Sequence, residues 1–89
     1  MKAVVTVVGK DRVGIIFDVT KVLAENNVNV LNISQTILDG YFTMIMITDI
    51  SKSNKSIAEL RETFSSLESE LGVDIRIQHE DIFNSMHSI

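Results

Sequence analysis

The residues best suited to chemistry in this chain form a polar loop, residues 9–14, between an apolar segment and a helical one. The loop contains Asp11 and Arg12 and ends at Gly14. The first amides of a helix lack intrahelical acceptors and lie at the positive end of its dipole, so a helix that begins here could bind a carboxylate. Gly14 has no side chain where a ligand would approach, and Asp11 adds a nearby negative charge. This combination suits a zwitterion such as a free amino acid.

A structural interpretation of the same loop stays open at this point. Asp11 could serve only to cap the helix, because aspartate is a preferred residue before a first helical turn. Gly14 could serve only to allow a tight turn. The residue types alone do not separate a ligand site from a simple bend.

Other chemistries lack the residues that they require. The chain has no cysteine, which excludes thiol nucleophiles, disulfides and thiolate zinc sites. A phosphate-binding loop would need lysine and a hydroxyl residue after its second glycine, and Ile15 and Ile16 stand there instead. Both histidines fall in the last eleven residues, so His79, Glu80, Asp81 and His87 are interpreted as a solvated polar end. We expect no enzyme activity, no cofactor and no metal site.

Composition sets the class of protein. The chain has 89 residues, of which 45% are hydrophobic and 22% charged, with a net charge of −4. These values indicate one small folded domain. Twelve acidic residues against eight basic ones argue against nucleic acid as a partner. No apolar run approaches the roughly 18 residues that a membrane span needs, and the lack of cysteine favours the cytoplasm.

The spacing of apolar residues predicts six elements and a tail. Strands are expected over residues 3–8, 28–38, 41–50 and 73–78, and helices over residues 14–26 and 57–71. Asp39 and Gly40 predict a two-residue hairpin turn. Ser56 and Glu59 predict a capping box, and Gly72 a helix end. Glu68 and Glu70 are expected to be solvated charges on the second helix, and a short helix is expected near the C-terminus.

The order strand, helix, strand, strand, helix, strand is that of a ferredoxin-like α+β sandwich. It predicts a four-stranded antiparallel sheet in the order 4-1-3-2, with both helices on one face. The first and third strands are apolar on both faces, as central strands should be. Either Val4 and Val8 or Val5 and Val7 must then lie on the face without helices.

Such an apolar face needs a cover. The tail residues Ile82, Phe83, Met86 and Ile89 could provide it, and so could a second copy of the chain. Edge strands offer a further route for pairing between copies. We expect a homodimer, and the sequence leaves open whether the copies meet face to face or side by side.

Two stretches carry a resemblance to a known family. They are G-K-D-R-V-G-I-I, which leads into the first helix, and V-N-V-L-N-I, which opens the second strand. With the element order, they make residues 1–79 similar to an ACT domain, followed by a helical tail over residues 80–89. The chain resembles most the small stand-alone ACT proteins of bacteria and archaea, in the style of the glycine-cleavage repressor group.

The resemblance implies a regulatory module that binds an amino acid as a homodimer and signals to a protein partner. It assigns ligand contacts to a set of loop and strand residues, of which the last is the weakest candidate: Asp11, Arg12, Val13, Gly14, Ile15, Asn29 and Asn32. The alternative is an association module with no small-molecule ligand, in which the apolar sheet surfaces are the working part.

Overall fold

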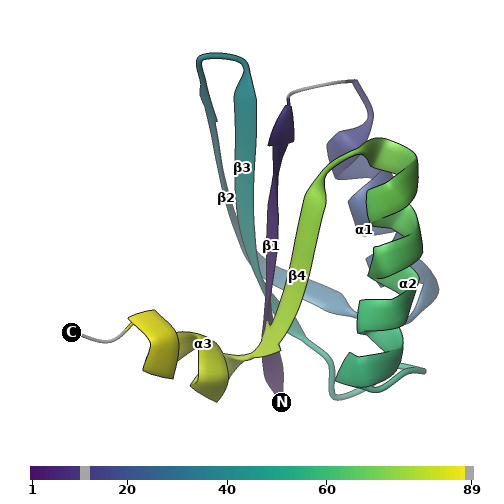
Figure 1. The fold of residues 1–89 in the computed structure, drawn as a ribbon. Helices are drawn as coiled ribbons and strands as arrows, with labels where there is room; N and C mark the ends of the chain where they lie inside the picture. Colours follow the sequence, from purple (N-terminus) through teal and green to yellow (C-terminus); the bar gives the residue numbers. More distant parts are fainter. Residues whose placement is uncertain (11–12, 88–89) are drawn as a thin grey trace.

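The computed structural model describes residues 1–10 and 13–87 as a sheet covered on one face by two helices (Figure 1). In chain order the elements are β1 (Lys2–Lys10), α1 (Ile15–Glu25), β2 (Asn29–Leu38), β3 (Tyr41–Asp49), α2 (Ile57–Leu71), β4 (Asp74–His79) and α3 (Glu80–His87). The strands pair antiparallel in the order β2-β3-β1-β4. The predicted ferredoxin-like fold and strand order are therefore confirmed.

Local signals in the sequence account for the turns and helix ends. Asp39 and Gly40 have φ angles of 53° and 80°, so both central hairpin residues are left-handed, as a type I′ turn requires. The Ser56 hydroxyl accepts from the Glu59 amide, and the Glu59 carboxylate accepts from the Ser56 amide. Gly72 ends α2 in the left-handed conformation, at φ 69°.

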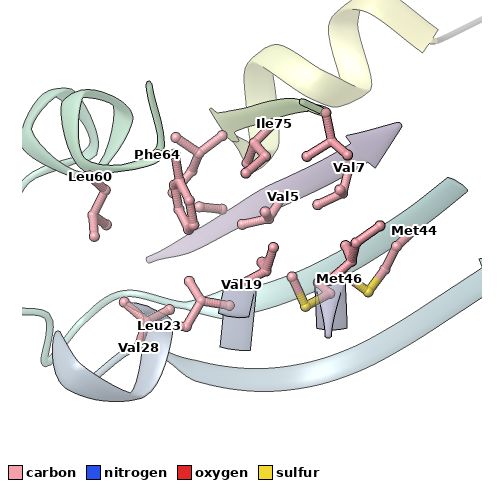
Figure 2. Packing of buried hydrophobic residues seen from close by; sticks show 14 of the residues in the cluster. Val5, Val7, Val19, Leu23, Val28, Met44, Met46, Leu60, Phe64 and Ile75 are labelled. Carbon is pink, nitrogen blue, oxygen red and sulfur yellow. The ribbon is translucent and has the colours of Figure 1, made fainter. Parts of the chain in front are cut away.

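The core lies between the sheet and the two helices (Figure 2). Val5 and Val7 of β1 belong to this cluster, so Val4 and Val8 lie on the opposite face. The structure thus decides between the two sets that the sequence left open. Figure 2 shows side chains from both helices and from the central strands meeting there: Val19, Leu23, Leu60, Phe64, Met44 and Met46.

The face without helices is only partly covered. The tail helix α3 follows β4 without a linker and contacts β1 and β4 on that side (Figure 1). Val4 is 1% exposed, whereas Val8 is 40% and Ile45 37% exposed. A groove of about 390 Å³ remains between α3 and the sheet, and Phe83 and Met86 line one side of it.

Candidate functional site

The predicted loop leads into a helix that begins after Gly14, and no described side chain caps its first turn. Gly14 is the residue before α1 and has a φ angle of 92°, which favours glycine. The first backbone bond of the helix runs from the Asp18 amide to the Gly14 carbonyl, at 2.9 Å. Within the described part of the chain, no side chain accepts from the amides of residues 15–17. Amides at such a helix start can bind an anion where no side chain takes them.

Asp18 stands beside this turn, and sequence reasoning missed it. Its Oδ2 lies 3.8 Å from the position that a Cβ on Gly14 would occupy, and the residue is half-buried. A carboxylate next to open amides can take the ammonium group of a zwitterion while the amides take its carboxylate. The signal in the sequence was an acidic residue four positions after the glycine that starts the helix.

The predicted loop residues differ in which of their groups could contact a ligand. Val13 is 98% exposed, and Ile15 is 2% exposed with its side chain in the core. Ile15 can therefore contact a ligand only through its backbone. Asp11 and Arg12 lie outside the described residues.

Asn29 and Asn32 do not lie at the loop of their own chain. Asn29 pairs with Asp49, which pairs with Lys2 at the start of β1, whereas the loop follows the end of β1 at Lys10. Eight residues of strand separate these ends, about 26 Å at roughly 3.3 Å per residue. A single chain therefore does not bring Asn29 to face the loop, although the resemblance paired them.

Asn29 instead lines a polar hollow of about 270 Å³ with Asn27, Asp49 and Lys52. The Ser51 hydroxyl and amide donate to Asp49 Oδ1 at 2.6 and 2.9 Å. These two hydrogen bonds hold the pKa of the Asp49 carboxyl below its usual value, and the bond from the Ser51 hydroxyl has the larger effect. The hollow thus presents amides, a carboxylate and an ammonium group at the start of β2.

The edge strand β2 is unusually open. Its ten residues include no charged side chain and no proline, although natural edge strands are commonly protected by such residues. Leu31, Ile33 and Ile37 are 44%, 48% and 58% exposed. An irregularity between Val30 and Asn32 is its one departure from regular pairing. Among the described residues, no side chain hydrogen bonds to its backbone.

The other edge, β4, is covered by α2. The Ile75 amide donates to Glu68 Oε2 at 3.0 Å, and Arg61 Nη2 donates to the Ile77 carbonyl at 3.2 Å. Glu68 is half-buried. The expectation that Glu68 is a solvated charge is therefore wrong, because α2 packs its side chain against the strand.

A metal centre and a membrane span find no support in the described part of the chain. No three His, Asp or Glu side chains there gather as metal ligands. His79 Nδ1 lies 3.7 Å from Asp81 Oδ2, and these two side chains do not form a group of three metal ligands with any other described residue. No helix among residues 1–10 and 13–87 is long and apolar enough to cross a bilayer.

Comparison with known proteins gives consistent matches over the whole fold. The ACT domain family matches residues 2–78, so the match ends before α3. A UPF0237 protein of Clostridium perfringens is 65% identical over 89 residues, which is all of both chains. An ACT domain protein from Streptococcus pneumoniae superposes with a TM-score of 0.81 at 43% identity, covering 93% of each chain. A candidate glycine cleavage system transcriptional repressor shares the fold, with a TM-score of 0.73 at 23% identity over 89% of this chain and 47% of that one.

Proposed function

Because this chain belongs to the ACT domain family, whose members are regulatory domains and not enzymes, we propose that it senses a free amino acid as a homodimer. The site is the loop between β1 and α1. The observation that carries the proposal is the start of α1. There the amides of residues 15–17 have no acceptor among the described side chains, and Asp18 Oδ2 lies 3.8 Å from the place of a Cβ on Gly14. The protein then passes the state of the site to a protein partner in the cytoplasm.

The chemistry of the turn supports a zwitterion over a simple anion. Open amides at the positive end of a helix dipole stabilise a carboxylate. A simple anion would be repelled by Asp18, which is part of the same turn. An amino acid carries both charges at a short separation, so each of its two groups meets its complement.

The open edge of β2 supports side-by-side pairing of two copies. Among the described residues no side chain takes its outward backbone groups, so they can form a ladder, and a neighbour would bury part of its exposed isoleucines. Two β2 strands related by a two-fold axis perpendicular to the sheet run antiparallel. The pair would form one continuous sheet of both copies.

This pairing also supports the assignment of Asn29 to the site. In an antiparallel pair about the middle of β2, the start of one strand lies beside the end of the other. The end of β2 is on the same side of the sheet as the loop, since Leu38 pairs with Tyr41 and Tyr41 with Lys10. Asn29 of the partner subunit would then lie near the loop, whereas Asn29 of the same chain lies at the opposite end of the sheet. Each site would take its helix turn from one copy and Asn29 from the other.

A thermal-shift panel of the twenty amino acids tests the binding. A ligand at one hundred times its Kd adds about 2.7 kcal/mol to the free energy of unfolding. This should raise the Tm by several degrees in a domain of this size. Asn29→Ala should abolish the shift, and Asn84→Ala, an exposed asparagine on α3, should keep it. No shift with any amino acid at millimolar concentration would contradict the proposal.

Mixing two inactive variants tests whether the site is shared. Asp18→Ala removes the loop side, and Asn29→Ala removes the β2 side, so each variant alone should not bind. A mixed dimer keeps one site with both wild-type groups. Equal amounts unfolded and refolded together should therefore recover about a quarter of the wild-type stoichiometry by calorimetry. No recovery would mean that both groups act within one chain or that the site is elsewhere.

A pure association module is the second candidate. The exposed apolar residues of β2 and the groove beside α3 favour it, because such surfaces commonly bind proteins. In that case no amino acid shifts the Tm, and Ile33→Lys disturbs function while Asp18→Ala does not.

A further inference from the structure

The free edge of β4 has two backbone groups bonded by side chains of its own chain. The Ile75 amide donates to the Glu68 carboxylate, and the Ile77 carbonyl accepts from the Arg61 guanidinium. Both side chains come from α2, from positions seven residues apart and therefore on one side of the helix. They reach past the packed face of α2 to the outer rim of the sheet.

Arg61 and Glu68 bond to the backbone groups that an added strand would need for pairing with β4. A fifth strand would present a carbonyl to the Ile75 amide and an amide to the Ile77 carbonyl. The Glu68 carboxylate stands in for the first, and the Arg61 guanidinium for the second. A shallow groove of about 350 Å³ runs along this rim, and both side chains line it with β4 residues 74–78. An incoming strand would have to displace both charged groups from their bonds.

The opposite rim has no such protection, since β2 has neither charged residues nor side-chain partners among the described residues. We infer that Arg61 and Glu68 form an edge block that excludes strands from β4, so that pairing between copies is confined to β2 and assembly stops at two chains. The inference rests on the proposed pairing through β2. With both rims open, each copy could accept two neighbours, and the sheet could grow into a filament.

The double variant Arg61→Ala with Glu68→Ala removes the edge block. Sedimentation velocity should then detect species larger than the wild type, and their share should rise with protein concentration. At low protein concentration, where copies are apart, hydrogen exchange should show the Ile75 amide exchanging roughly five- to tenfold faster than in the wild type. Circular dichroism checks that the variant is folded. If it is not, Glu68→Ala alone gives the same two readouts with less disturbance.

Conservative variants separate hydrogen bonding from general effects of α2. Glu68→Gln keeps an acceptor oxygen and Arg61→Lys keeps a donor, so both should retain the wild-type mass. Glu70→Ala removes an exposed charge from the same helix and should also retain it. The inference is overturned if the double variant keeps the wild-type mass, or if the Ile75 amide stays equally protected. Both readouts are compared with the wild type without any ligand, so a failure of amino-acid binding leaves them intact.

Discussion

The two edges of the sheet differ in what meets their outward backbone groups. At β4, two side chains of α2 bond to the strand. At β2, ten uncharged residues lie along the rim, and nearly all are exposed. Within residues 1–10 and 13–87, side chains of α2 cover one edge and no side chain bonds to the other, although both strands end the same four-stranded sheet.

Because the two edges differ in this way, we expect substitutions at β4 to affect the stability of the fold and substitutions at β2 to affect pairing between copies. A change on the β4 side should weaken the fold, because that side is bonded and closely packed within one chain. A change on β2 should weaken pairing between copies and leave the fold almost intact, because β2 makes few contacts with the helices that a substitution could break. The following experiments test these expectations.

The largest effect is expected from a charge on the open edge. Ile33→Lys places an ammonium group on β2, where pairing would bury it, and lysine on an edge strand opposes pairing. We expect the mass measured by light scattering to fall from that of a dimer to that of a monomer, with an unchanged circular dichroism spectrum. Gln78→Lys places the same group on β4 and should leave the mass unchanged. Equal masses for Ile33→Lys and the wild type would argue against pairing through β2.

The next effect concerns the close contact between β1 and Val73, the residue before β4. A Cβ on Gly9 would lie 2.5 Å from Val73 Cγ1 and 2.9 Å from Val73 Cβ. Valine branches at Cβ and cannot swing aside, so Gly9→Ala should lower the free energy of unfolding by roughly 1–3 kcal/mol in urea titrations. Gly40→Asn is a matched control in open space, at a left-handed position that asparagine tolerates. A wild-type midpoint for Gly9→Ala would mean that the two strands separate easily here.

A smaller effect is expected from one half of the edge block. Glu68→Ala leaves the Ile75 amide without its acceptor, which should lower the free energy of unfolding by about 1 kcal/mol. In a domain of this size, the Tm would fall by roughly 4–8 °C. Glu70→Ala should change it far less, because Glu70 is exposed on the same helix. Similar falls for both variants would point to a general effect on α2 and not to the bond.

The smallest effect is expected in the stability of the fold at acidic pH. The Ser56 amide and hydroxyl hold the pKa of the Glu59 carboxyl below its ordinary value of 4.5. The folded state therefore binds this proton less readily than the unfolded state, so the contribution of Glu59 is present above that value and is lost as the pH falls through the lowered pKa. Unfolding followed between neutral pH and pH 3 should show a shallower loss of stability in Glu59→Gln than in the wild type. The β2 strand has no ionisable side chain, so its pairing should not change through its own groups over this range.

Much of the fold could be predicted because its signals are local. The hairpin turn needs two left-handed residues, and Asp39 and Gly40 supply them. The capping box needs Ser56 and Glu59 at one spacing. The strand order followed from the order of elements, and the two strands that are apolar on both faces agreed with it.

The candidate site was harder to predict because it depends on distances between elements. Asp18 is an ordinary helix residue until α1 is placed with Gly14 beside its carboxylate. Asn29 belongs near the loop by resemblance, yet the antiparallel register puts it at the other end of the same chain. Only the register makes clear that a second copy would be needed to bring them together.

The sequence by itself determined the order of elements, their ends and the partition of strands into central and edge positions. Those properties depend on neighbouring residues and on hydrophobic periodicity, which act before the chain is packed. The tertiary structure decided which face of β1 meets the helices, because Val4, Val5, Val7 and Val8 are the same residue type. It also decided that β4 is closed and β2 open, because a helix side chain can protect a strand edge only where packing brings the two together.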